Sequence, residues 1–206
     1  MMEGGVFKYM IRVGIIGKIA SGKSFIAKLF NSPVFNADRE VNFLYKNSRQ
    51  CFKKLKKILP NYIKSFPIKK SEIISAINNE KKNLKKVSSV VHPMVRKQLK
   101  TFIRKNKNRK LVILDIPLLI ENKLNMENDV LVFVKCNRNK ILERLKKRPN
   151  YNKKILKSLS QNQIINSKKL RMANYIIDNN FSPHIMKNKI ILLKKKILNE
   201  RNNIRH

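Results

Sequence analysis

The feature that most constrains this chain is a glycine-lysine-serine pattern near its start. Residues 17–24 read GKIASGKS, which fits the spacing G-x-x-x-x-G-K-[ST]. An apolar run at 11–16, typical of a buried strand, precedes the pattern, and apolar residues at helical spacing follow it. The pattern therefore predicts a phosphate-binding loop between a strand and a helix. The alternative interpretation is an ordinary strand-to-helix turn.

The loop residues have distinct expected roles. Successive backbone N–H groups in such a loop surround an anion, and the dipole of the following helix adds positive potential there. We expect Lys23 to reach the β- and γ-phosphates and take part in catalysis, and the Ser24 hydroxyl to bind Mg²⁺. The full set expected to bind ATP at the loop is Gly17, Ala20, Ser21, Gly22, Lys23, Ser24 and Phe25.

Apolar runs of strand length recur along the chain, with helical stretches between them. Such alternation predicts an α/β fold in which helices cover both faces of a parallel sheet. The strand candidates lie at residues 11–16, 34–35, 111–114, 130–134 and 175–177.

A long insertion separates the second and third strand candidates. Residues 42–110 carry apolar side chains at helical spacing and predict a helical lobe, with Pro93 in the first turn of one helix. A basic helix at 139–148 follows the fourth strand and is stopped by a proline. Residues 150–169 are polar with few apolar anchors, and we expect them to be mobile. A lysine-rich amphipathic helix over 183–204 completes the fold.

The charge of the chain is strongly positive. Its 48 Lys and Arg residues against 12 Asp and Glu residues give a formal net charge of +36. Nucleic-acid binding is one interpretation. Lysine is spread over the whole chain beside asparagine and isoleucine, however, which favours a bias of composition over a dedicated basic patch. We therefore expect polyanionic small molecules as ligands and no dedicated nucleic-acid partner.

The composition predicts a soluble protein of the cytoplasm. Hydrophobic residues make up 42% of the chain, which is enough for a core. Cys51 and Cys136 have neither metal-binding nor redox spacing and fit structural thiols in a reducing compartment. Because the N-terminus lacks an apolar core of signal-peptide length, and the longest apolar run, 111–120, contains Asp115, we expect no membrane partner. We also expect a monomer, with an oligomer as the alternative.

Acidic residues are scarce, so the positions of the aspartates are informative. Three of the four, Asp38, Asp115 and Asp178, closely follow strand candidates. In an open α/β sheet, ligands bind at the carboxyl ends of the strands, so these carboxylates are expected at the phosphate-loop end. The alternative for each is a helix cap or a surface ion pair.

Two arginines and a histidine are further candidates. Arg144 and Arg148 lie four residues apart on the predicted helix, so their guanidinium groups share one face and can converge on a polyphosphate. A solvated helix face is the alternative. His92, taken alone, fits a capping or core histidine better than a ligand.

Six short segments recur in the order typical of one known family. They are IIGKIASGKS (15–24), VFNAD (34–38), VVHPMVR (90–96), DIPLLIEN (115–122), ERLKKR (143–148) and Gln163 with YIIDNN (175–180). Together they resemble the dephospho-coenzyme A kinase family, P-loop kinases of the nucleoside-monophosphate-kinase type. The resemblance implies ATP-dependent phosphorylation of the ribose 3′-hydroxyl of dephospho-CoA, the final step of coenzyme A synthesis.

The resemblance also implies a fold and a division of the chain. The fold would be a five-stranded parallel sheet flanked by helices, with a helical substrate-binding lobe and a lid. Residues 10–206 would form one kinase domain after a tail of residues 1–9. Its parts would be a core of 10–41, 111–138 and 170–206, the lobe of 42–110 and the lid of 139–169.

Carried over residue by residue, the resemblance assigns roles on both substrates. Asp38 matches the proposed catalytic base. Arg144 matches a catalytic lid arginine, and Arg148 lies beside it at the nucleotide. Asn179 matches an asparagine near the adenine. The residues implied to bind the acceptor are Asp38, Lys70, His92, Arg96 and Asp115, of which Lys70 stands in place of an arginine.

Several residues depart from the family pattern. The departures are Lys18 and Ala20 for two loop glycines, Asn36 for the first aspartate of a D-A-D element, and Phe181 for a glycine after the two asparagines. Because Asp38 is retained, we expect slower or looser catalysis rather than its loss.

Two other functions stay open on the sequence. Another P-loop kinase, for a nucleotide or a small alcohol, would share the loop, the sheet and the lid arginines, although residues 36–38 and 115–121 speak against it. A basic nucleic-acid-binding P-loop protein would show a steep salt dependence of binding and exposed aromatic residues. The aromatic residues here fall mostly at core-like positions, which disfavours this second alternative.

Overall fold

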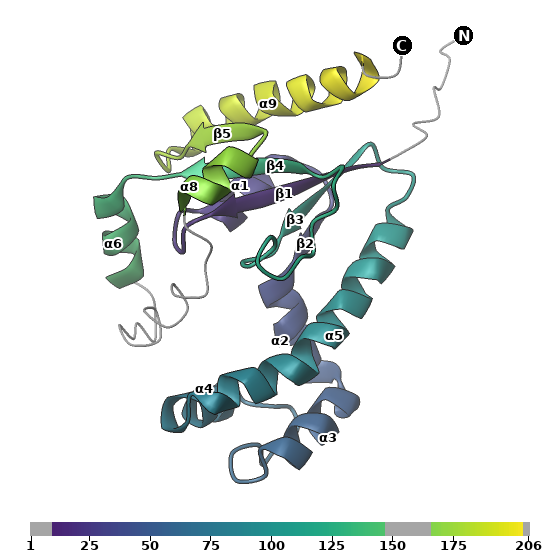
Figure 1. Ribbon diagram of the computed structural model, residues 1–206, viewed down its shortest axis with the longest axis vertical. Coiled ribbons are helices and arrows are strands. Elements are labelled where there is room, and N and C mark those ends of the chain that lie inside the picture. The colour runs from purple at the N-terminus through teal and green to yellow at the C-terminus, as the bar shows by residue number, and fades with distance from the viewer. Residues whose placement is uncertain (1–9, 147–165, 204–206) are drawn as a thin grey trace. The chain divides into compact units, whose positions relative to one another are not determined.

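The chain forms two compact units (Figure 1). The computed structural model describes residues 10–146 and 166–203. The sheet unit comprises the chain up to Phe35 and from Lys105 onward, and the helical unit comprises Asn36–Arg104. The helical unit thus begins and ends slightly earlier than the lobe expected at 42–110.

The sheet unit contains a five-stranded sheet with strand order β2-β3-β1-β4-β5. The pairs β1 with β3, β1 with β4, and β4 with β5 are parallel. Each strand lies where the sequence predicts it and extends one residue further at its carboxyl end, which confirms the predicted sheet. The bounds are β1 Ile11–Gly17, β2 Val34–Asn36, β3 Leu111–Asp115, β4 Val130–Lys135 and β5 Tyr175–Asp178.

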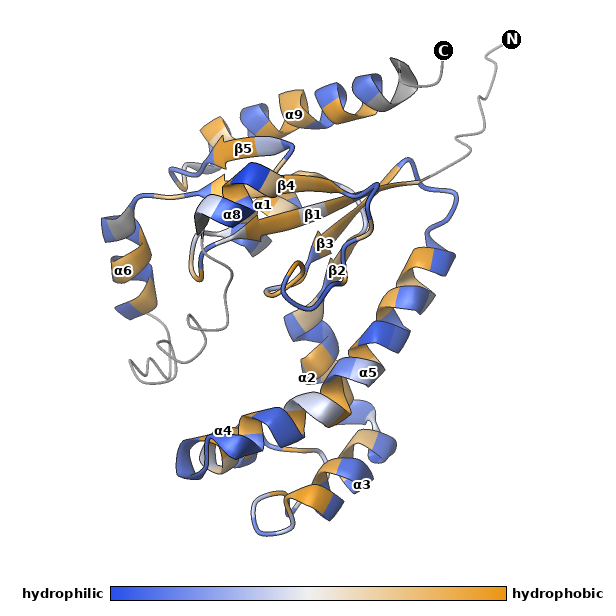
Figure 2. Cartoon of the chain, viewed as in Figure 1, coloured by the Kyte–Doolittle hydropathy of each residue, from blue (hydrophilic) through white to orange (hydrophobic). Residues whose placement is uncertain are grey.

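The three central strands are buried along nearly their whole length. Strands covered on both faces read as continuous apolar runs, and Figure 2 shows the hydrophobic colour concentrated in them. On one face, helices α1 (Lys23–Leu29) and α9 (Pro183–Asn203) contribute Ile26, Met186 and Ile190, each 0% exposed. On the other face, the loop after β3 covers β1, and a Cβ atom at Gly14 would collide with Leu119.

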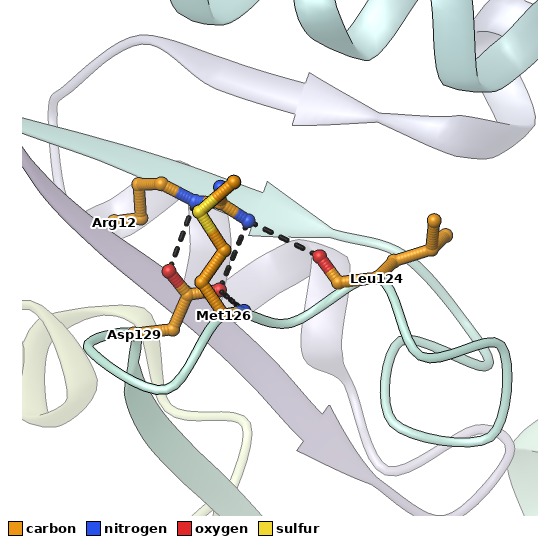
Figure 3. A network of polar contacts seen from close by, with 4 residues as sticks. All are labelled: Arg12, Leu124, Met126 and Asp129. Atoms are coloured by element: carbon orange, nitrogen blue, oxygen red, sulfur yellow. Dashed lines mark hydrogen bonds and ion pairs between the residues drawn. The ribbon is translucent and has the colours of Figure 1, made fainter.

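An ion pair lies at the amino end of the central strands, away from the phosphate loop. The register pairs Val13 with Val130, which places Arg12 of β1 beside Asp129. Arg12 Nε lies 2.9 Å from Asp129 Oδ1, and a terminal nitrogen of Arg12 donates to Asp129 Oδ2 and to the Leu124 carbonyl (Figure 3). Asp129, the one aspartate outside the expected site, thus has a structural role.

The predicted helical insertion is present. Its buried residues include Leu44, Leu55, Ile73 and Val91, and the Ile68 amide donates to the Tyr45 carbonyl at 3.0 Å. The helices are α2 Ala37–Asn47, α3 Arg49–Ile58, α4 Lys70–Asn79 and α5 Lys82–Lys105, although α5 ends in the sheet unit.

The expected position of Pro93 is wrong, because this proline lies in the middle of the 24-residue helix α5. A proline inside a helix removes one backbone hydrogen bond and favours a helix break. Here Val87, Val91, Val95 and Leu99 are buried at intervals of one turn on both sides of the proline. This continuous apolar stripe stabilises the helix across Pro93 and outweighs the local preference.

The expected lid is described only at its two ends. Helix α6 (Arg138–Lys146) agrees with the predicted basic helix, and helix α8 (Asn166–Met172) packs against β1 and β4. The prediction that 150–169 is mobile is therefore wrong for its last four residues, because α8 buries Lys169 to 1% exposure. Residues 147–165, with Arg148 and Gln163, lie outside the described residues. In the described part of the chain, no helix has the length and apolarity needed to cross a membrane.

Candidate active site

The phosphate loop joins β1 to α1 with two glycines at positive φ, where a side chain would be both strained and crowded. Gly17 has φ 145°, and Gly22, the residue before α1, has φ 92°. A Cβ atom at Gly17 would lie 2.6 Å from the Val134 carbonyl oxygen, and one at Gly22 would collide with Asn179 and Phe181. The loop backbone therefore packs closely against its neighbours at both glycines, and Gly22 has the left-handed conformation that occurs in anion-binding nests.

Lys23 lies over this loop. Its Nζ donates to the carbonyl oxygens of Gly17 at 3.2 Å and Lys18 at 2.8 Å. The side chain is partly exposed, so its charge lies at the loop surface where a phosphate would bind. Ser24, the second residue of α1, is exposed in the first helical turn. Kinases hold Mg²⁺ with one or two protein oxygens plus phosphate oxygens and water, and the Ser24 hydroxyl fits such a donor set.

Two of the departures from the family's glycines occupy left-handed backbone. Ala20 has φ 63° and Phe181 has φ 64°. A residue with a Cβ atom pays roughly 1–2 kcal/mol for that conformation, whereas glycine does not. Lys18, by contrast, is not among the described residues with positive φ. The loop and the turn after β5 therefore keep a glycine-type backbone although the glycines are gone.

The turn after β5 contacts the phosphate loop through Asn179. This residue is 4% exposed, and its Nδ2 donates to the Ser21 carbonyl at 2.8 Å. Its Oδ1 accepts from the Phe181 amide at 2.9 Å, and its own amide donates to the Lys135 carbonyl at 2.8 Å. Backbone groups thus engage both ends of the Asn179 side chain, while its expected place near the adenine stays a prediction.

Phe181 contacts several of the residues predicted to lie on the nucleotide side. Its ring centroid lies 6.3 Å from that of Phe25, and the guanidinium carbon of Arg144 lies 4.1 Å from the Phe181 centroid. The latter distance is that of a cation–π contact. Arg144 of α6, Phe25 of α1, Gly22 and Asn179 therefore meet at one place beside the phosphate loop. Sequence reasoning noted Phe181 only as a departure from glycine.

The aspartates predicted to follow strands differ in their surroundings. Asp115 ends β3 with 3% exposure. Because Leu114 pairs with Gly14 of β1, Asp115 lies one residue nearer the phosphate-loop edge. The Asp178 side chain is 71% exposed and forms an ion pair with exposed Lys135 at 3.7 Å. The surface ion pair, which was the alternative interpretation, therefore holds for Asp178.

Asp38 lies in the helical unit, in the first turn of α2. It follows the end of β2 by two residues, and its side chain is exposed. Asn36, which replaces an aspartate of the family, caps this helix and accepts from the Arg39 amide at 2.8 Å. Asparagine and aspartate cap helices about equally well, so the substitution preserves the start of α2.

The remaining acceptor-side candidates are exposed on helices of the same unit. Lys70 is the first residue of α4, and His92 and Arg96 lie one turn apart on α5. Partial burial, and then the positive charge of Arg96, lower the pKa of His92 below its usual value. His92 is therefore neutral at pH 7 and can both donate and accept hydrogen bonds.

Comparison with known proteins decides the family. The model of the dephospho-CoA kinase family matches residues 11–184. This chain belongs to the dephospho-CoA kinase family. A curated dephospho-CoA kinase from Wolbachia sp. subsp. Brugia malayi (strain TRS) is 33% identical over 175 residues, which cover 82% of this chain and 89% of that relative.

Solved structures share the fold. TT1252 from Thermus thermophilus superposes with a TM-score of 0.73 at 24% identity, covering 94% of this chain and 98% of that one. A dephospho-CoA kinase from Campylobacter jejuni gives a TM-score of 0.63 at 21% identity, covering 90% and 96%. The predicted P-loop kinase fold and the resemblance to the dephospho-CoA kinase family are thus confirmed.

One buried ion pair of this dephospho-CoA kinase family member escaped the sequence analysis. Lys169 Nζ lies 2.6 Å from Glu121 Oε1, with the two side chains 2% and 9% exposed. Glu121 belongs to the family segment DIPLLIEN, and Lys169 to α8. The pair joins the loop after β3 to a helix that packs on β1 and β4. Among 48 basic residues, no sequence signal distinguishes Lys169 from lysines on the surface.

Proposed function

We propose that this protein transfers the γ-phosphoryl group of ATP to the ribose 3′-hydroxyl of dephospho-CoA and so forms coenzyme A. Its membership of the dephospho-CoA kinase family makes it an ATP-dependent kinase of coenzyme A synthesis. The observation that carries the proposal is the phosphate loop, in which Gly17 and Gly22 adopt the backbone that an anion site needs and Lys23 lies over the loop.

On the nucleotide side, the loop binds the phosphates through its backbone N–H groups. The residues assigned to ATP are Gly17, Ala20, Ser21, Gly22, Lys23, Ser24, Phe25, Arg148 and Asn179. Lys23 exchanges its loop carbonyls for oxygens of the β- and γ-phosphates and neutralises the charge that develops during transfer. Mg²⁺, held by Ser24, would supply further charge neutralisation at the same oxygens.

On the acceptor side, Asp38 holds the attacking hydroxyl in line and takes its proton. This carboxylate lies exposed in the first turn of a helix, so a bound sugar can reach it without disturbing the core. The diphosphate of dephospho-CoA offers acceptor oxygens for the cations Lys70 and Arg96. Neutral His92 hydrogen-bonds to the acceptor without adding charge. Asp115 completes the acceptor set, as a buried carboxylate at the end of β3.

Arg144 changes partner during the reaction. Its guanidinium group lies over the Phe181 ring beside the phosphate loop. A cation–π contact at an exposed site contributes only about 0.5–1 kcal/mol, so a polyphosphate competes with it readily. Arg144 then stabilises the transferred phosphoryl group. We further propose that the enzyme acts as a monomer in the cytoplasm, where Cys51 and Cys136 stay free thiols, as they are here.

One assay tests the proposed reaction. Purified protein is mixed with MgATP and, separately, dephospho-CoA, AMP, CMP, TMP or shikimate, and ADP release is followed. Of these acceptors, we expect only dephospho-CoA to support turnover. Its product should act as a substrate of a coenzyme A-dependent acetyltransferase. Faster turnover with a nucleoside monophosphate or with shikimate would assign the protein to another acceptor.

A further inference from the structure

One peptide of the phosphate loop is held by a hydrogen bond from far along the chain. The Asn179 Nδ2 donates to the Ser21 carbonyl oxygen at 2.8 Å across 158 residues of sequence. Both residues are buried, Ser21 at 0% and Asn179 at 4% exposure. The bond therefore links the turn after β5 to the middle of the loop, where water competes little for it.

The planarity of the peptide bond gives this contact a consequence for the loop. In a trans peptide the C=O and the following N–H point in opposite directions. Holding the Ser21 oxygen toward Asn179 thus directs the Gly22 N–H away from Asn179. An anion nest needs its N–H groups on the ligand side and its carbonyl groups turned away.

Local sterics alone do not fix this orientation. Gly22 has φ 92° and ψ 24°, and glycine populates both signs of φ about equally. The Ser21–Gly22 peptide could therefore invert at little local cost and present its carbonyl oxygen to the phosphates. A long-range donor on the Ser21 oxygen removes that freedom.

We propose that Asn179 is a positioning residue, which fixes the Ser21–Gly22 peptide in its phosphate-binding orientation and contributes to affinity for the polyphosphate rather than for the base. Its Oδ1 already accepts from the Phe181 amide at 2.9 Å. Both functional groups of the amide thus serve the protein's own backbone. This inference rests on the proposed use of a nucleoside triphosphate, and it gives Asn179 a role distinct from recognition of adenine.

The chain offers a matched control in the next residue. Asn180 Oδ1 accepts from the Ser182 amide at 3.0 Å, the same two-residue turn bond that Asn179 makes with Phe181. Asn180 is exposed, and its side chain accepts this bond on the side of the turn, not from the phosphate loop. Asn180→Ala removes a turn bond without touching the loop. Asn179→Asp keeps the turn acceptor of Asn179 and removes the donor, and Asn180→Asp adds the same charge one residue away.

Binding is measured without acceptor, by calorimetric titration of the full chain with MgATP and with inorganic tripolyphosphate, which has no base. We expect Asn179→Ala to weaken the binding of both ligands by the same factor, about tenfold, the size of one lost hydrogen bond. Asn179→Asp, which also adds a negative charge, should weaken the binding of both at least as much. Both Asn180 variants should stay within about twofold of wild type. If the Asn179 variants weaken the binding of MgATP but not that of tripolyphosphate, Asn179 recognises the base and the proposal is wrong.

A second measurement on wild-type protein needs no variant to fold. Ser21–Gly22 is the only Ser–Gly bond in the chain, so carbonyl-¹³C serine with ¹⁵N glycine labels this single peptide for NMR. We expect one resonance that shifts on adding tripolyphosphate, and that is displaced or broadened in Asn179→Ala but not in Asn180→Ala. If the Gly22 amide resonance does not shift on adding tripolyphosphate, the positioning role is wrong. Wild-type protein that binds neither ligand overturns the proposed function as well.

Discussion

The two sets of candidate residues are built in different ways. The nucleotide set in the sheet unit depends on main-chain geometry, with positive φ at Gly17, Ala20 and Gly22 and a buried tie from Asn179. The acceptor set, apart from Asp115, which is buried at the end of β3 in the sheet unit, consists of exposed side chains on helix surfaces of the helical unit. Substitutions in the first set should therefore change stability or binding as well as turnover. Substitutions in the second should change turnover or acceptor affinity and leave folding intact.

Lys23 should show the largest effect, because its charge lies directly over the phosphate loop. We expect Lys23→Ala to lower turnover roughly 10³–10⁵-fold, the range known for a cation that neutralises charge in phosphoryl transfer. Lys23 is partly exposed, so the unfolding temperature should stay near that of wild type. Steady-state kinetics and thermal unfolding check both points. Unchanged turnover would contradict the role of the loop.

Asp38 is the matching test on the acceptor side. Asp38→Asn keeps the size and one acceptor oxygen but cannot take the proton, so turnover should fall roughly 10²–10⁴-fold. The affinity for ATP should hardly change, because the loop residues bind the nucleotide. Stability should fall by no more than about 1 kcal/mol, the contribution of an exposed carboxylate to the first turn of a helix. Turnover within about threefold of wild type would show that Asp38 serves only the start of α2.

Lys169 tests the buried framework of the nucleotide side. Lys169→Met removes one cation from Glu121 in a site where the Glu121 and Lys169 side chains are 9% and 2% exposed. Breaking a buried ion pair in this way costs about 3–5 kcal/mol of unfolding free energy. Denaturant unfolding measures the loss, and Lys168→Met, an exposed neighbour, is the control. The double variant with Glu121→Gln should recover much of the loss, because neither charge then remains buried.

Arg144 should show a smaller effect that separates turnover from binding. Arg144→Ala should lower turnover by about 10²-fold, as for other groups that stabilise charge in the transition state. The KM for dephospho-CoA should change much less, because Arg144 lies beside the phosphate loop over Phe181. A variant with normal turnover and weak acceptor binding would move Arg144 to the acceptor set.

These differences also explain what the sequence could predict. Buried parallel strands are continuous apolar runs, so all five were found from local pattern alone. The predicted position of Pro93 in a first helical turn was wrong, because the buried apolar stripe along α5 outweighs the local preference of proline for helix starts. The tie from Asn179 to Ser21 spans 158 residues, and no local spacing can reveal such a contact. Lys169 was missed because its burial depends on packing, which composition does not encode.

The smallest effect is expected at Ala20, where three contributions to stability oppose one another. Ala20→Gly would relieve the left-handed strain at φ 63°, a gain of roughly 1–2 kcal/mol. Glycine would also raise the conformational entropy of the unfolded chain, which lowers stability by roughly 0.4–1 kcal/mol. Because Ala20 is only 6% exposed, loss of its buried methyl group would lower stability by about a further 0.8 kcal/mol.

These contributions cancel to within about 1 kcal/mol, so denaturant unfolding of Ala20→Gly should resemble wild type. Lys123 is the control, with φ 51° on an exposed residue that buries no such methyl group. Lys123→Gly should therefore stabilise the protein by about 1 kcal/mol. A comparable gain from Ala20→Gly would show that the loop is strained. Near-neutrality would mean instead that burial of the alanine methyl group offsets the strain, which makes an alanine tolerable where the family has glycine.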